Sequence, residues 1–191
     1  MSRTALFVID IQRALADSPG TEISHARRIR DAGASILDKV RANIDEAQSR
    51  GEAPGLEIIV VQHEETRDKG NLQLGTRAWQ LVFPPHPSPH ETLVSKNIRD
   101  TFESNPGLAD ELRARNVGTI VAFGIQSECC VLSTCKGALA ADFRVVLLKG
   151  AHSTYDAEGK TAEEIEREVE EELRNEGAEV VDWNKWSKGW D

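Results

Sequence analysis

Apolar runs that alternate with longer amphipathic segments constrain the fold of this chain more than any other feature. Residues 5–11 (ALFVIDI) and 118–125 (GTIVAFGI) are nearly all apolar, as expected for strands buried on both faces of a sheet. Residues 24–51 carry apolar side chains at helical spacing and end at a glycine, which is typical of a helix terminus. The alternation predicts an α/β fold of three α/β/α layers, Rossmann-like, with a mostly parallel sheet of about six strands. The expected strands are residues 5–11, 56–64, 91–96, 118–125, 143–150 and 178–183.

Length and charge narrow the class of protein. The chain has 191 residues, which predicts a single domain, residues 1–191. It carries 23 Lys and Arg against 32 Asp and Glu, a net charge of −9. That balance argues against nucleic acid or an anionic membrane as a partner. The apolar run near the start is too short for a signal peptide, and the three cysteines form a poor disulfide framework, so we expect a cytoplasmic protein.

Four reactive types of side chain fall at the ends of expected strands. Asp10 follows the first strand, His63 ends the second, Lys96 ends the third, and Cys129 and Cys130 come just after the fourth. The carboxyl ends of parallel strands lie at one edge of a sheet, where ligands bind in folds of this class. The sequence therefore predicts that these side chains share one site.

The two adjacent cysteines are expected at the start of a helix. Ser127 is a suitable N-cap, so Cys129 and Cys130 would lie in the first turn, where free N–H groups favour a thiolate. Cys135 lies more than a turn deeper and is expected to be a small buried apolar residue.

A thiolate that attacks a carbonyl carbon needs a base, a cation and donors for the oxyanion. Asp10 can be the base, Lys96 the cation, and the backbone amides of the first helical turn the donors. Each residue alone has a plainer interpretation, as a buried ion-pair partner or a solvated lysine. Their shared position favours catalysis.

Three separated motifs resemble those of the isochorismatase-like cysteine hydrolases, a superfamily that includes nicotinamidases, N-carbamoylsarcosine amidase and isochorismatase. These are an Asp-x-Gln at the end of the first strand (VIDIQ), a lysine that ends a short strand (LVSKNIRDTF), and a Gly-x-x-Ser-x-x-Cys-Val turn (GIQSECCV). They occur in the family's order, and the resemblance covers essentially the whole chain.

The resemblance implies a set of roles. Asp10, Lys96 and Cys130 would form the catalytic triad, and the backbone N–H groups of Gln126 and Cys130 would form the oxyanion hole. It also implies a cis peptide bond between Ile125 and Gln126. Cys130 would then be the nucleophile, with Cys129 packed beside it.

The chain departs from the metal-dependent nicotinamidases of this superfamily after the second strand. Those enzymes carry an Asp-x-His and further histidines there, whereas this chain has Val61 in place of the aspartate. His63 alone lacks the partners that a metal ion needs, so we predict no metal and no cofactor. Gln62 and His63 are instead expected to hydrogen-bond the substrate.

Other polar and aromatic residues are candidate substrate contacts. Gln12 belongs to the first motif, Trp79 lies in the long loop of residues 66–90 and can stack on a planar substrate, and His152 follows a strand. Phe102 is a weaker candidate for the pocket. His86 and His90 lie among prolines and are expected to be exposed loop residues.

These features predict a metal-independent hydrolase that cleaves the C–N bond of a small amide, carbamoyl or ureido compound through a Cys130 thioester. One alternative is an isochorismatase-type vinyl-ether hydrolase, which does not require the cysteine. Another is a catalytically silent binding protein on the same fold.

The C-terminal segment contains three tryptophans, Trp183, Trp186 and Trp190. Such large apolar side chains are rarely left in water. We expect them to cover a partner subunit in a homo-oligomer, a dimer or larger, with packing on the chain's own helices as the alternative.

Overall fold

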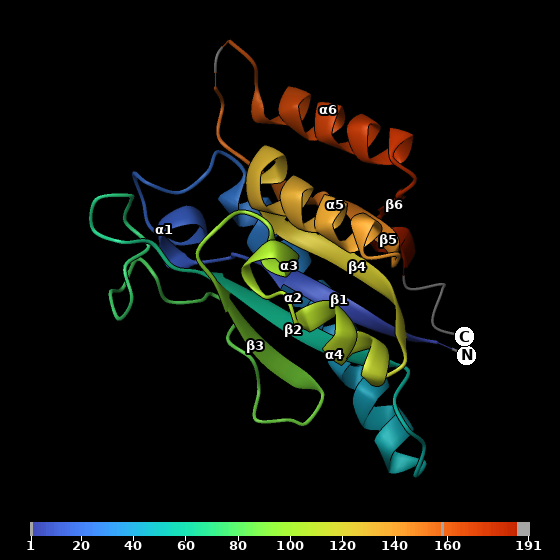
Figure 1. Cartoon of the computed structure of the whole chain (residues 1–191). Helices are drawn as coiled ribbons and strands as arrows, with labels where there is room; N and C mark the ends of the chain where they lie inside the picture. Colours follow the sequence, from blue (N-terminus) through green and yellow to red (C-terminus); the bar gives the residue numbers. More distant parts are fainter. Residues whose placement is uncertain (1, 158, 187–191) are drawn as a thin grey trace.

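The computed structural model describes residues 2–157 and 159–186, and in this part of the chain six strands form one sheet (Figure 1). Every strand pairing is parallel, and the order is β3-β2-β1-β4-β5-β6. The predicted α/β class and mostly parallel sheet are confirmed. The strands are β1 (Arg3–Ile9), β2 (Leu56–His63), β3 (Glu91–Lys96), β4 (Val117–Ile125), β5 (Arg144–Ser153) and β6 (Glu179–Asp182).

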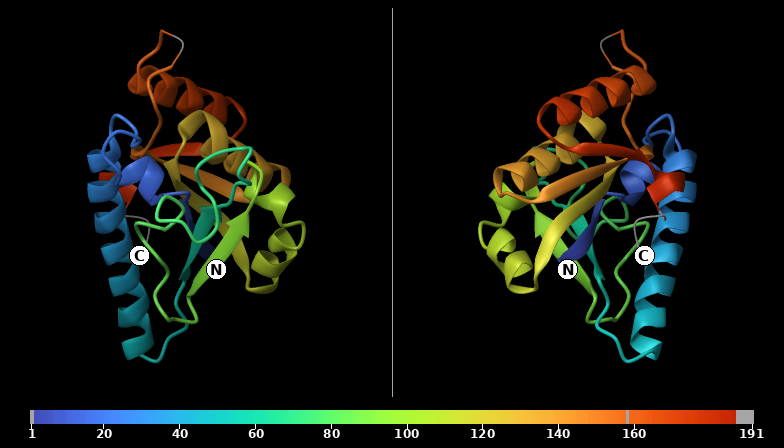
Figure 2. Two further views of the ribbon diagram at one scale, coloured as in Figure 1. Left: turned by 90° about the vertical axis from the view of Figure 1, so that its left-hand side faces the viewer. Right: turned by 90° about the vertical axis from the view of Figure 1, so that its right-hand side faces the viewer.

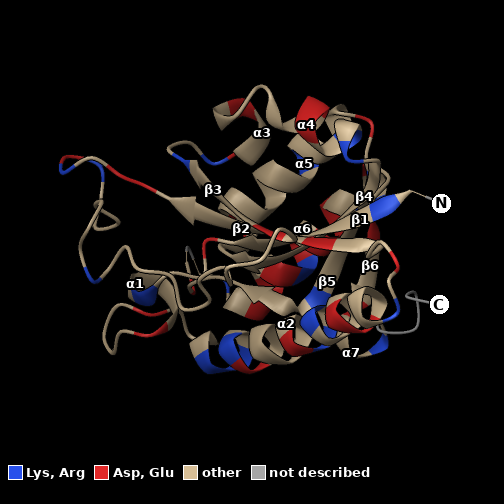
Figure 3. Cartoon of the chain, turned by 90° about the horizontal axis from the view of Figure 1, so that it is seen from below, with Lys and Arg blue, Asp and Glu red and all other residues tan. Residues whose placement is uncertain are grey.

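Helices cover both faces of the sheet, as Figure 2 shows from two sides. The long helix α2 (Ala26–Ser49) packs its apolar stripe on one face, together with the short helices α1 (Arg13–Ala16) and α7 (Trp183–Trp186). Lys and Arg alternate with Asp and Glu along the outer side of α2 (Figure 3). The other face is covered by α3 (Thr101–Ser104), α4 (Leu108–Ala114), α5 (Leu132–Ala140) and α6 (Ala162–Asn175).

Local signals explain several of these boundaries. Thr161 caps α6 and forms a reciprocal capping box with Glu164, as the sequence predicts. Asp100 accepts a hydrogen bond from the Phe102 amide at 2.8 Å and begins α3, which the sequence analysis did not anticipate. In the described residues, no helix is long and apolar enough to cross a membrane.

The direction in which successive strands are added to the sheet reverses between β1 and β4. This reversal brings together the residues that follow these two strands. The chain proceeds from β1 outward to β3, returns to place β4 beside β1, and then proceeds to the other edge. In doubly wound sheets the crevice beyond the carboxyl ends at this point is where ligands bind. Residues that follow β1 and β4 are therefore brought together although about 115 positions separate them in the chain.

Gly124 allows β4 to lie close to β1 at this crevice. Its φ is +142°, and a Cβ at this position would lie 2.0 Å from the carbonyl oxygen of Ile9. Only glycine fits such a close backbone approach.

The start of the cysteine-bearing helix differs from the sequence prediction. Ser127 is not the N-cap: a π-helical turn, η1 (Ser127–Val131), precedes α5, and its N-cap is Gln126 without a side-chain bond. The Ser127 hydroxyl instead lies 2.8 Å from Nδ1 of His152. The strand β5 is also longer than predicted, so His152 lies within it rather than after it.

Candidate active site

Asp10 lies directly beyond β1 at the sheet reversal, and its side chain is buried. Its backbone has a φ of +50°, which an aspartate tolerates better than most residues. Its amide donates to the carbonyl of Val61 at 3.1 Å, which ties the turn to β2. The carboxylate is thereby held in the crevice.

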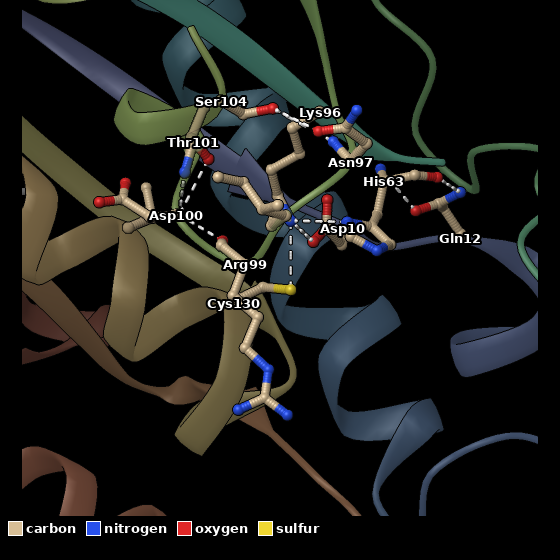
Figure 4. Close-up of polar contacts among 12 residues, drawn as sticks. Asp10, Gln12, His63, Lys96, Asn97, Arg99, Asp100, Thr101, Ser104 and Cys130 are labelled. Carbon is tan, nitrogen blue, oxygen red and sulfur yellow. Dashed lines mark hydrogen bonds and ion pairs between the residues drawn. The ribbon is translucent and has the colours of Figure 1, made fainter. Parts of the chain in front are cut away.

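Lys96 ends β3 and brings an ammonium into the same crevice (Figure 4). Its Nζ lies 2.7 Å from Oδ2 of Asp10, 3.2 Å from Sγ of Cys130 and 3.0 Å from Nδ1 of His63. It also donates to the carbonyl of Ile98 at 3.1 Å. Burial by itself would lower the pKa of Lys96, but the Asp10 carboxylate and the Cys130 sulfur raise it above its ordinary value. The lysine therefore remains an ammonium.

Cys130 lies in η1, with its side chain mostly buried beside Lys96. Burial, and after it the charge of Asp10, raise the pKa of the Cys130 thiol, against the opposing effect of Lys96. The sequence analysis expected the helix start to favour a thiolate, whereas burial and the charge of Asp10 favour the neutral thiol. A base is then needed to take the proton, and the ligand atoms of Asp10 and Cys130 lie within 4.8 Å of each other.

His63 joins this group as a neutral imidazole. Burial, followed by the charge of Lys96, lowers the pKa of His63 below its ordinary value. Because an ammonium has no lone pair, Nδ1 accepts from Lys96 and the ring proton resides on Nε2. His63 also lines the pocket beside Cys130, as the sequence predicts for a substrate contact.

The backbone of η1 is closed by hydrogen bonds on both sides of Cys130. The amides on either side of it, those of Cys129 and Val131, both donate to the carbonyl of Gln126, at 3.2 and 3.1 Å. The peptide bond between Ile125 and Gln126 is cis, so the expectation drawn from the family resemblance is confirmed.

A pocket of about 360 Å³ opens over these groups, a volume typical of small-molecule sites. Asp10, Gln126, Cys129 and Cys130 line it. Its other lining residues come from α1 and the loop after it, the loop after β2, Arg99 and the segment after β5. The residues contributed by these segments are Ala14, Leu15, Thr21, Glu65, Gly70, Asn71, Leu72, Arg99 and Tyr155.

Three residues that the sequence predicts to contact substrate, Gln12, Gln62 and Trp79, do not line the pocket. Gln12 is fully buried; its amide donates to the carbonyls of His63 and Trp79, and its oxygen accepts from the His63 amide. Gln62 donates to the carbonyl of Trp79 at 2.9 Å. Neither glutamine lines the pocket, and Trp79 is partly buried outside it. These side chains hold the long loop against the sheet instead.

His152 is also absent from the pocket wall. It is fully buried, with Nδ1 at 2.8 Å from the Ser127 hydroxyl and Nε2 at 3.7 Å from Oε1 of Glu170. Burial by itself would raise the pKa of Glu170, but His152 and then Lys149 lower it below its ordinary value. His152 therefore links α6 to the first residue of η1, the turn that carries Cys130.

The remaining candidate residues lie outside the pocket, some in the core and some in the loop before β3. Phe102 is buried in the core, stacked on Phe7 with ring centroids 5.7 Å apart, and does not reach the pocket. Cys135 is buried as predicted, and burial raises its pKa to about 12. His86 is exposed and His90 is partly buried.

Sequence reasoning missed several wall residues, among them Glu65, Arg99 and Tyr155. Arg99 follows Lys96 by three positions, and that proximity was an available signal. Glu65 and Tyr155 lie in loops whose course depends on tertiary contacts, such as the Glu65 carboxylate accepting from the Leu72 amide at 2.9 Å.

One group in the described residues has the composition of a metal site: Asp10, His63 and Cys130, whose ligand atoms lie within 4.8 Å of one another. The Lys96 ammonium, however, contacts an atom of each of the three. It makes the contacts that a metal ion would make, so the residues present do not fit a metal at this point.

The C-terminal tryptophans pack partly on the chain itself. Trp183 and Trp186 contact the core under α2, and the ammonium of Lys39 lies 5.6 Å from the Trp183 ring centroid. Trp190 lies outside the described residues. The contact with a partner subunit stays a prediction.

The sheet order, with a carboxylate, an ammonium and a thiol meeting at its reversal, defines a doubly wound α/β protein with a candidate active site at that reversal. Comparison with known proteins narrows this class. A family model described as the isochorismatase domain matches residues 4–185. The chain therefore belongs to the isochorismatase family, as the motifs predicted.

Individual proteins are similar to this chain in sequence or in fold. Streptothricin hydrolase of Streptomyces noursei is 33% identical over 153 residues, 80% of this chain and 50% of that protein. The chain thus spans about half the length of the curated relatives it matches. Among solved structures, an isochorismatase-like hydrolase from Alkaliphilus metalliredigens has a TM-score of 0.80 at 19% identity, covering 100% of this chain and 97% of that one. The zinc complex of pyrazinamidase from Pyrococcus horikoshii has a TM-score of 0.69 at 22% identity, covering 94% and 99%.

Proposed function

We propose that the protein is a cysteine hydrolase that cleaves the C–N bond of a small amide, carbamoyl or ureido compound. The observation that carries this proposal is the meeting of three groups from separate elements. The Lys96 ammonium lies 2.7 Å from Asp10 and 3.2 Å from the Cys130 sulfur, at the edge of a pocket sized for a small molecule.

In the first half of the reaction, the Asp10 carboxylate takes the proton of the Cys130 thiol as the substrate carbonyl approaches. The sulfur then bonds to the carbonyl carbon, and the carbonyl oxygen becomes an oxyanion. Lys96 stabilises the sulfur while it carries negative charge. The amides of Gln126 and Cys130 are the proposed donors to the oxyanion.

In the second half, the protonated Asp10 gives its proton to the leaving nitrogen, the C–N bond breaks, and a thioester to Cys130 remains. Asp10, again a carboxylate, takes a proton from water as the water oxygen attacks the thioester carbon. The C–S bond breaks, the sulfur regains the proton from Asp10, and the acid product departs. Protons and electrons balance without another reactant.

Small amides and ureides can test this proposal, with ammonia release as the readout. Streptothricin belongs in the panel, because a relative of this chain is named for its hydrolysis. We expect turnover of at least one member, loss of turnover in Cys130→Ala, and an acyl adduct on Cys130 in rapidly quenched samples. Cys129→Ala is the matched control, because it removes the neighbouring thiol and should leave adduct formation at residue 130.

Vinyl-ether hydrolysis is the second candidate, because the matching family model is described by isochorismatase. That chemistry uses an acid and does not need the thiol. Turnover of isochorismate, with pyruvate as the readout, that persists in Cys130→Ala would favour it over the amidase proposal.

A further inference from the structure

Arg99 and Glu65 are charged residues of the pocket wall that the proposed chemistry does not use, and Arg99 is the cation of the two. Most arginines of the described chain are ion-paired, for example Arg3, Arg28 and Arg41, whereas no carboxylate within residues 2–157 and 159–186 pairs with Arg99. Its side chain is exposed, and it lines the pocket with Cys130. A guanidinium in this position is available to a ligand.

The backbone around Arg99 is held in place, although its side chain is exposed. The Lys96 ammonium donates to the carbonyl of Ile98 at 3.1 Å, and the Thr134 hydroxyl donates to the carbonyl of Arg99 at 3.4 Å. Asp100 caps α3 directly afterwards. Figure 4 shows the Arg99 side chain extending away from the Lys96 ammonium. The guanidinium is thus a second cationic group, apart from the one in the triad.

Each of the two carboxylates that line the pocket has a polar contact within the protein, and Asp10 has a cationic partner. Asp10 is neutralised by Lys96 at 2.7 Å, and the Glu65 carboxylate accepts from the Leu72 amide at 2.9 Å. Arg99 also borders a neighbouring open hollow, which shares His63 with the pocket. A substrate held over Cys130 can therefore extend past Arg99 toward solvent.

We propose that Arg99 selects substrates that carry an anionic group, a carboxylate in the first instance, a few bonds from the carbonyl carbon that Cys130 attacks. This inference rests on the proposed amidase function and narrows its substrates to short anionic amides and ureido acids. A guanidinium binds a carboxylate through paired N–H donors, which gives orientation as well as affinity.

The first experiment does not depend on catalysis. Iodoacetate and iodoacetamide alkylate a thiol at the same kind of carbon, but only iodoacetate carries a carboxylate. In a Cys129→Ala background, we measure both rates at Cys130 and take the ratio of the iodoacetate rate to the iodoacetamide rate. Arg99→Met should lower this ratio about tenfold, a typical effect of losing one charge-assisted hydrogen-bonded contact.

Arg77→Met is the matched control. Arg77 is exposed, and its replacement changes the net charge by the same amount, but it does not line the pocket. Its ratio should equal that of the parent. Equal ratios in the Arg99 and Arg77 variants would overturn the anion-binding role.

The second experiment uses substrate pairs of matched size. Succinamate should be hydrolysed with a higher kcat/KM than butyramide, and Arg99→Met should remove about tenfold of that preference, mainly through KM. If no amide is hydrolysed but the alkylation ratio still depends on Arg99, the proposed function fails and the anion site stands. If amides are hydrolysed with a preference for cationic members that Arg99→Met does not change, the inference fails and the proposed function stands.

Discussion

The pair formed by Lys96 and Asp10 allows a quantitative test of stability that is separate from activity. Lys96→Met keeps the length of the side chain and removes the ammonium. The exposed fractions of the two side chains are 0% and 2%, and Nζ lies 2.7 Å from Oδ2. The variant leaves a buried carboxylate without its cation, which typically costs about 3–5 kcal/mol of unfolding free energy.

The expected loss of unfolding free energy is large because the pair is buried, and not because the two charges are close. The ammonium of Lys160 lies 2.7 Å from Glu168, the same separation, but those side chains are 50% and 58% exposed. Water screens that pair, so Lys160→Met should change stability by no more than about 1 kcal/mol. It is the matched control for the loss of one lysine.

A double-mutant cycle of Lys96 and Asp10 tests whether the uncompensated carboxylate causes the loss of unfolding free energy. Asp10→Asn removes the carboxylate and suits the positive φ of this position. If the uncompensated charge causes the loss, the double variant Asp10→Asn, Lys96→Met should recover about 2–3 kcal/mol relative to Lys96→Met alone.

Unfolding in guanidinium chloride, followed by far-ultraviolet circular dichroism, gives these free energies. All three site variants are expected to be inactive, so activity does not enter the comparison. A Lys96→Met protein as stable as the parent, or a double variant no more stable than Lys96→Met, would refute the reasoning.

Three further outcomes follow from the same geometry. Gly124→Ala places a Cβ 2.0 Å from the Ile9 carbonyl oxygen; thermal unfolding should show a loss of about 3 kcal/mol or more, and an unchanged midpoint would contradict the close approach. Burial and, after it, the charge of Asp10 raise the pKa of the Cys130 thiol, so Asp10→Asn should lower that pKa. Thiolate absorbance at 240 nm should then rise at a lower pH than in the parent; a shift upward or none would exclude this cause. His152→Ala removes the bond to the start of η1 and should reduce kcat about tenfold or more with little change in KM, well below the unfolding temperature. An unchanged kcat would leave His152 a purely structural role.

Part of the candidate site could be predicted from the sequence, because successive side chains of a strand point to opposite faces of the sheet. Val61 and His63 lie two residues apart in β2 and point to the same face, the one that carries η1. Gln62, between them, points to the opposite face, where it binds the loop carbonyl of Trp79. The sequence analysis did not apply this alternation to Gln62, whose contact with a substrate stays a prediction.

His152 was misplaced for a different reason. In β5, Leu147 pairs with Ala122 and His152 pairs with Gly124, so the strand carries extra residues at an irregularity that includes Gly150 at a φ of +82°. Such a bulge changes which residue faces the crevice and extends the strand beyond its apolar run. The local sequence carries only a weak sign of it, a single glycine.

The sequence by itself determined the alternation of strands and helices, the charge balance, and the three residues proposed as the triad, because these depend on local periodicity and on motifs. The tertiary structure decided that β4 lies beside β1, that burial raises the pKa of the Cys130 thiol, and that Arg99 rather than Gln12 borders the pocket. These properties depend on burial and on contacts between residues far apart in the chain. Neither the desolvation of a side chain nor the course of a long loop is encoded in any one short segment.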